Sequence, residues 1–117
     1  MQMPLELEFR NLPSSPALEA LVRSRVDKLE RLYDRITGCR VTVEAPHRHQ
    51  HQGRRFEVHV QLVVPGNVLV YSHDKGMPEH EDANTAVRDA FDAIQRQLED
   101  HARIERGNVK AHSRPKG

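Results

Sequence analysis

The segment from Pro16 to Ile36 predicts an amphipathic helix that has to cover another apolar layer. At 100° per residue, its apolar side chains form a single stripe. The stripe consists of Leu18, Leu21, Val22, Val26, Leu29, Leu32, Tyr33 and Ile36. Ser15 and Pro16 are typical of an N-cap and a first helical position, and we expect Gly38 to end the helix as a C′ glycine.

The polar side of this helix is divided by the sign of its charges. Lys28, Arg31 and Arg35, spaced i, i+3 and i+7, lie on one flank of the stripe. The other flank carries Glu19, Asp27, Glu30 and Asp34. Arg25 falls near the middle of the apolar stripe, so we expect it to extend outward or to pair with another group.

Four further segments alternate apolar and polar residues and predict strands with one buried face, at 5–10, 39–45, 56–64 and 68–71. Pro65, Gly66 and Asn67 predict a tight turn between the last two strands. Polar loops are expected at 46–53 and 72–81.

A second helix is predicted from the N-cap Asp82 to Gly107. Its apolar stripe consists of Ala83, Ala86, Val87, Ala90, Phe91, Ile94, Leu98 and Ala102. Its charges are spaced to form i, i+4 ion pairs. These pairs are Arg88–Asp92, Asp92–Arg96, Arg96–Asp100 and Glu99–Arg103. We expect a folded domain over residues 1–106 and a basic flexible tail over 107–117.

The order β-α-β-β-β-α predicts an α+β fold, a two-layer sandwich similar to a double-stranded-RNA-binding domain. The helix between the first two strands makes them parallel, with a right-handed connection, and the later turns make an antiparallel meander. Both helices then cover one face of a four-stranded mixed sheet. We expect the opposite face to expose Glu8, Arg10, Arg40, Thr42, Glu44, His59 and Gln61 to water.

Composition restricts the function. The 117 residues include 18 basic and 17 acidic ones, so net charge alone predicts no nucleic-acid partner. Cys39 is the single cysteine and is expected in the core, which favours a reducing cytoplasm. The N-terminus lacks the apolar core of a signal peptide, and no run is long enough to cross a membrane. Motifs for catalysis or phosphate binding are absent, so we expect no enzyme, cofactor or small-molecule substrate.

His47, His49 and His51 raise the question of a metal site in the polar connection. Imidazole binds zinc well, but a structural site needs four ligands, and the sequence offers no second cysteine or nearby acid cluster. Flanking Arg48, Arg54 and Arg55 would repel a cation. We therefore predict no metal; the loop is either a polar hairpin or a hairpin tip that contacts RNA.

The basic flank of the first helix is the strongest candidate for a binding site. A row of long cations on a rigid helix can contact several phosphates along a nucleic-acid strand. A solvated flank with internal ion pairs would give the same pattern, so charge alone leaves both interpretations open.

Three segments together resemble the short ribosome hibernation-promoting factor and protein Y family, also called sigma-54 modulation proteins. They are PALEALVRSRVDKLERLYDRI, VPGNVLVYSHDKG and HEDANTAVRDAFDAIQRQLEDHARIERG, within a likeness over residues 5–106. The resemblance implies a cytoplasmic factor of stress and stationary phase that binds small-subunit rRNA in the mRNA and tRNA channel. It would hold idle ribosomes inactive and be a monomer off the ribosome.

The resemblance also suggests site residues. Arg25, Lys28 and Arg31 match basic positions of the family's first helix, and Arg96 matches one in the second. Relatives continue with a Lys/Arg-rich segment where this chain has Glu99 and Asp100, so other basic residues are expected to compensate. The predicted RNA-binding set is Arg25, Lys28, Arg31, Arg35, Arg48, Arg54, Arg55, Arg96 and Arg103. The alternatives are a protein-binding module acting through the second helix or exposed sheet face, and a small metalloprotein using the histidine loop.

Overall fold

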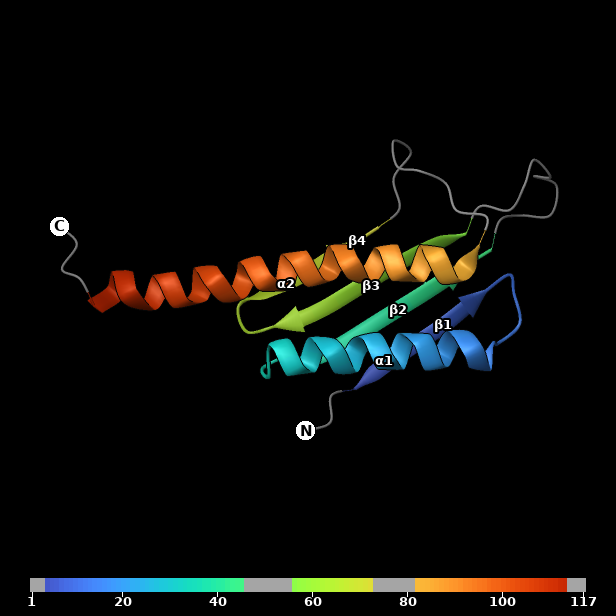
Figure 1. Cartoon of the computed structure of the whole chain (residues 1–117), viewed down its shortest axis with the longest axis horizontal. Coiled ribbons are helices and arrows are strands. Elements are labelled where there is room, and N and C mark those ends of the chain that lie inside the picture. Colours follow the sequence, from blue (N-terminus) through green and yellow to red (C-terminus); the bar gives the residue numbers. More distant parts are fainter. Residues whose placement is uncertain (1–3, 46–55, 73–81, 114–117) are drawn as a thin grey trace.

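The computed structural model describes residues 4–45, 56–72 and 82–113, with side chains up to residue 107. Its elements follow the predicted order (Figure 1). They are β1 (Leu5–Arg10), α1 (Pro16–Leu32), β2 (Gly38–Glu44), β3 (Glu57–Val64), β4 (Asn67–Tyr71) and α2 (Ala83–Ser113). The predictions for the histidine loop, for Arg48, Arg54 and Arg55, and for the loop before Asp82 lie outside the described residues.

The sheet has the predicted topology, with strand order β1-β2-β3-β4. β1 and β2 are parallel and in register from Leu5 opposite Cys39, and the remaining pairs are antiparallel. Gly66 has φ 79°, a left-handed conformation that glycine adopts without steric cost. With Pro65 before it, this geometry matches a type II turn and places Val64 opposite Asn67.

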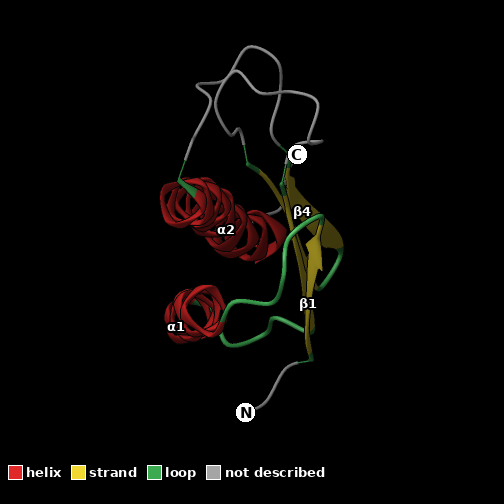
Figure 2. Cartoon of the chain, turned by 90° about the vertical axis from the view of Figure 1, so that its right-hand side faces the viewer, coloured by secondary structure: helices red, strands yellow, loops and turns green. Residues whose placement is uncertain are grey.

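Both helices cover the same face of the sheet, which confirms the α+β two-layer architecture (Figure 2). α2 lies over β3 and β4 and also packs against α1. The core between the layers contains most of the two predicted stripes, with Val22, Leu29, Phe91 and Ile94 almost fully buried. Leu32, which was predicted in the stripe of the first helix, is 46% exposed, because it is the last residue of α1. Neither described helix combines the length and apolar character needed to cross a membrane.

The start of α1 is as predicted, but its end is not. The Ser15 hydroxyl accepts a hydrogen bond from the Leu18 N–H at 3.2 Å. The helix stops at Leu32 because Tyr33 takes an extended conformation, with φ −152° and ψ 113°. Tyr33 and Ile36 still reach the core, from the segment after the helix. The predicted continuation to Ile36 and the C′ role of Gly38 are therefore wrong; Gly38 begins β2.

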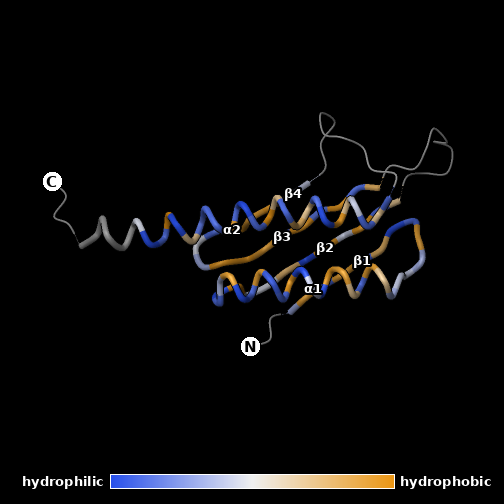
Figure 3. The backbone as a smooth tube through the Cα atoms, in the orientation of Figure 1, coloured by the Kyte–Doolittle hydropathy of each residue, from blue (hydrophilic) through white to orange (hydrophobic). Residues whose placement is uncertain are grey.

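α2 begins as predicted and ends later. Asp82 accepts a hydrogen bond from the Asn84 N–H at 3.0 Å and another from the Thr85 hydroxyl at 3.1 Å. Gly107 does not end the helix, which continues to Ser113. It extends past the sheet (Figure 1), and the part of this overhang that is coloured in Figure 3 is mostly hydrophilic.

The outer face of the sheet is polar with two departures. Thr42 is buried, contrary to prediction, because β2 is an inner strand and Thr42 lies between its register partners Glu8 and His59. Val68 and Val70 of β4 are the exposed apolar residues of this face, at 46% and 52%.

Candidate nucleic-acid interface

An ion pair between the helices fixes which flank of α1 faces α2. Arg25 reaches Asp92 with a nitrogen–oxygen distance of 3.5 Å, and 20% of the Arg25 side chain is exposed. Pairing was one of the two outcomes expected for Arg25, and the structure shows that its partner is an acid of the other helix. Because Lys28 and Arg31 follow Arg25 at i+3 and i+6, the basic flank runs along the junction between the two helices.

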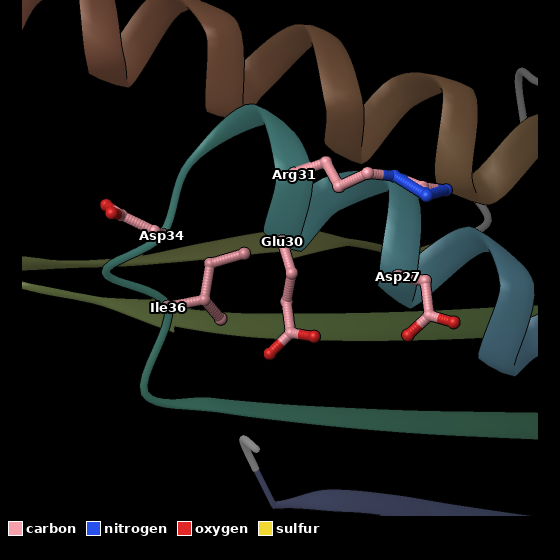
Figure 4. Close-up of a pocket in the computed structure, with 5 residues that line it drawn as sticks. All are labelled: Asp27, Glu30, Arg31, Asp34 and Ile36. Atoms are coloured by element: carbon pink, nitrogen blue, oxygen red, sulfur yellow. The ribbon is translucent and has the colours of Figure 1, made fainter. Parts of the chain in front are cut away.

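The charge division of α1 is preserved in three dimensions. Figure 4 shows Arg31 on the α2 side of α1, with the carboxylates of Asp27 and Glu30 on the other side. These residues, together with Asp34 and Ile36, line an open hollow of about 350 Å³. Lys28 and Arg31 are exposed and form no ion pair with any residue the structure describes.

Arg35 does not belong to this flank. It lies beyond the end of α1, and its guanidinium binds Glu105 of α2 at 2.6 Å. The same group lies 5.5 Å from the centre of the Tyr33 ring. The predicted row of Lys28, Arg31 and Arg35 on one helix face is therefore wrong, because the helix ends before Arg35 and a carboxylate already pairs with it.

Arg35 is part of a cluster that anchors the far end of α2. The Tyr33 hydroxyl donates a hydrogen bond to Glu105 at 3.0 Å. The Tyr33 ring meets the His101 ring edge-on, with centroids 5.6 Å apart. Burial and then the Glu105 hydrogen bond raise the pKa of Tyr33, since both favour the neutral phenol. This cluster ties the segment after α1 to α2.

The predicted ion-pair ladder on α2 does not form within the described part of the chain. Asp92 pairs with Arg25 of the other helix, Asp100 pairs with Arg103, and Glu99 accepts a hydrogen bond from Gln95 at 3.1 Å. The acids of α2 are thus engaged by other partners. Arg103 is compensated as well, so it is a weaker candidate for RNA than predicted.

These pairings leave Arg88 and Arg96 as exposed cations on α2, without an ion pair among the described residues. They lie one turn before and one turn after Asp92. We call Lys28, Arg31, Arg88 and Arg96 the basic helix surface. Sequence reasoning missed Arg88 because its i, i+4 spacing to Asp92 implied neutralisation, and only the contact between the helices reveals the competition.

The fold and this surface define a small two-layer α+β domain that presents exposed cations from its helical layer. A profile described as sigma 54 modulation protein / S30EA ribosomal protein matches residues 5–105, and the chain belongs to this family.

Individual relatives agree with the family and the fold. A ribosome hibernation promotion factor from Deinococcus radiodurans is 31% identical over 93 residues, which cover 80% of this chain and 46% of that protein. The chain thus spans about half the length of this relative. A ribosomal subunit interface protein from Coxiella burnetii has a similar structure, with a TM-score of 0.68 and 16% identity. The match covers 86% of this chain and 98% of that protein. The N-terminal domain of Thermus thermophilus protein Y is also similar in structure, with a TM-score of 0.64 and 20% identity. The match covers 84% of this chain and 96% of that domain.

Proposed function

We propose that this domain binds the small ribosomal subunit in the mRNA and tRNA channel and keeps idle ribosomes from translating. It acts in the cytoplasm during stress or stationary phase, as a binding protein without catalysis. Family membership supports this proposal, as do the names of the relatives. The observation that carries it is the basic helix surface, which combines four exposed cations on two packed helices.

The physical basis is electrostatic. Each cation that meets an rRNA phosphate releases counterions, which gives affinity without base recognition. The helices are held together by the Arg25–Asp92 pair and by a shared core, so the cations need little ordering on binding. Arg25 supports the surface by positioning α2, and its pairing makes it a poorer phosphate ligand than its sequence position implies.

The acids of α2 do not oppose this proposal. Asp92 and Asp100 each have an arginine partner, which reduces the field that they present to an incoming phosphate. α2 then contributes through Arg88 and Arg96. The contribution of Arg48, Arg54 and Arg55 and of the basic tail remains a prediction from the sequence.

A sucrose-gradient experiment tests the proposal. Purified protein is mixed with separated 30S and 50S subunits and with 70S ribosomes, and its position is followed by immunoblotting. We expect it to migrate with 30S and 70S particles, to dissociate as salt rises, and to inhibit translation in a cell-free system. Migration with 50S subunits alone, or no migration with any particle at low salt, would contradict the proposal.

The second candidate is a protein-binding module acting through the outer face of the sheet. The exposed valines of β4, Val68 and Val70, favour it. Ribosome binding through this apolar pair would be nearly independent of salt, whereas binding through the basic helix surface weakens steeply. Changing both valines to threonine separates the candidates, since β-propensity is kept while the apolar surface is reduced.

A further inference from the structure

The register between β2 and β3 gathers three potential metal ligands at one end of the outer sheet face. Glu44 lies directly opposite Glu57, and His59 follows Glu57 on the same face of β3. One ligand atom from each of these residues lies within 4.8 Å of the other two. This cluster cannot be recognised in the sequence, because it exists only once the two strands are paired.

Among the described residues, two carboxylates lie opposite each other at this point of the sheet. Like charges directly opposite each other across two strands are destabilising, and Glu44 and Glu57 form such a pair. Arg10 is the register partner of Glu44 on β1. Its guanidinium is already engaged by Glu8 at 3.1 Å. A cation bound between Glu44 and Glu57 would therefore relieve the repulsion between these two carboxylates.

The histidine is held in an orientation suited to ligation. His59 Nδ1 lies 3.1 Å from the Ser72 hydroxyl, and Nε2 lies 3.8 Å from a Glu57 oxygen. A hydrogen bond from one ring nitrogen to a neighbour is the usual way in which a protein fixes the tautomer of a metal-binding histidine. In the tautomer in which Nδ1 donates to Ser72, Nε2 carries the lone pair and lies on the side of Glu57.

We propose that Glu44, Glu57 and His59 bind a divalent transition-metal ion, for which Zn²⁺ is the best match. One imidazole and two carboxylates suit Zn²⁺, with a water molecule as the fourth ligand. Ligand atoms around tetrahedral zinc are roughly 3.4 Å apart, given bond lengths near 2.1 Å. Exposed glutamates can close the remaining gap through their own rotamers. Such a site would bridge β2 and β3 where the histidine-containing connection leaves and re-enters the sheet.

Titration of tag-free, EDTA-dialysed protein with zinc chloride, by calorimetry and by melting temperature, tests the proposal. We expect binding of one Zn²⁺ with a rise in melting temperature. His59→Gln and Glu57→Gln should each weaken binding at least about tenfold, and Ser72→Ala about tenfold, as expected for an outer-shell partner. Glu6→Gln is the matched control, because Glu6 is an outer-face carboxylate paired with Arg40. It should leave binding unchanged.

The loop histidines require their own comparison. A variant with His47, His49 and His51 all changed to glutamine keeps the proposed ligands and removes the competing ones. In this background, His59→Gln should still weaken Zn²⁺ binding at least about tenfold. Absence of binding up to millimolar zinc, or unchanged binding in both His59→Gln and Glu57→Gln, would overturn the proposal. Circular dichroism of each variant in EDTA verifies that the fold is intact.

Discussion

Neutralising Lys28 and Arg31 together should remove a measurable share of ribosome affinity without affecting the fold. Both side chains are exposed and form no ion pair with described residues, so glutamine at each position leaves no partner uncompensated. The affinity for nucleic acid falls with salt with a logarithmic slope of about 0.7–0.9 per phosphate contact. At 0.1 M salt, relative to 1 M, each contact therefore contributes about 5–8-fold. Losing two contacts should weaken binding by about 25–60-fold.

The assay is co-sedimentation of labelled protein with 30S subunits over a range of salt concentrations. The control is Arg10→Gln with Arg40→Gln, which removes the same charge from the opposite layer, where Glu8 and Glu6 compensate those arginines. We expect the control to bind within about twofold of the wild type and to keep its salt slope, while the slope of the helix variant decreases by about 1.4–1.8. Equal weakening in both variants would show that net charge matters and that the basic helix surface does not.

Three further predictions concern stability. Arg35→Ala should lower the free energy of unfolding by up to about 1 kcal/mol, because it removes a partly exposed ion pair. Its affinity for 30S subunits should stay within about twofold of the wild type. A large loss of affinity would show that Arg35 contacts the ribosome after all. Burial raises the pKa of Cys39 to about 12, above the ordinary value of 9.0, so the unfolded thiol ionises first as pH rises. Between pH 8 and 10.5 the wild type should therefore lose about 2 kcal/mol that Cys39→Ala does not lose, measured by urea unfolding, and parallel pH profiles would contradict this. Asp82→Ala removes the N-cap of α2 and should cost about 1 kcal/mol, visible as a lower melting temperature; an unchanged value would mean that the start of α2 does not need its cap.

The strands and the helix starts were predictable because the signals that set them are local. Alternation of period two identified all four strands, and the side chains of Ser15 and Asp82 identified the N-caps that the structure contains. The helix ends were not predictable from Gly38 and Gly107. Glycine is common after a helix, but its presence does not force the helix to end there. α1 ends where Tyr33 and Ile36 can enter the core from an extended segment, a tertiary gain that outweighs continuing the helix.

The candidate site was predicted in part, and its errors have one cause. Helical spacing gives the neighbours of a charge within its own helix but not the competitors on another. Asp92 was expected to pair with Arg88 and Arg96, and it pairs with Arg25. Glu105 similarly engages Arg35. Lys28, Arg31 and Arg96 remain candidates because no described acid reaches them, which is a property of the packed molecule.

The part of α2 that extends past the sheet should unfold separately from the part that packs on the core. From Ala86 to Leu98 one face of the helix is buried in the core, so we expect the amide hydrogens of these turns to exchange mainly when the whole domain unfolds. Glu105 marks the last described contact with the segment after α1. Past Glu105, no contact among the described side chains joins the helix to the rest of the chain, and Gly107 weakens the helix by about 1 kcal/mol relative to alanine. A surface that orders these final turns would therefore slow their hydrogen exchange selectively, leaving the exchange of the core amides unchanged.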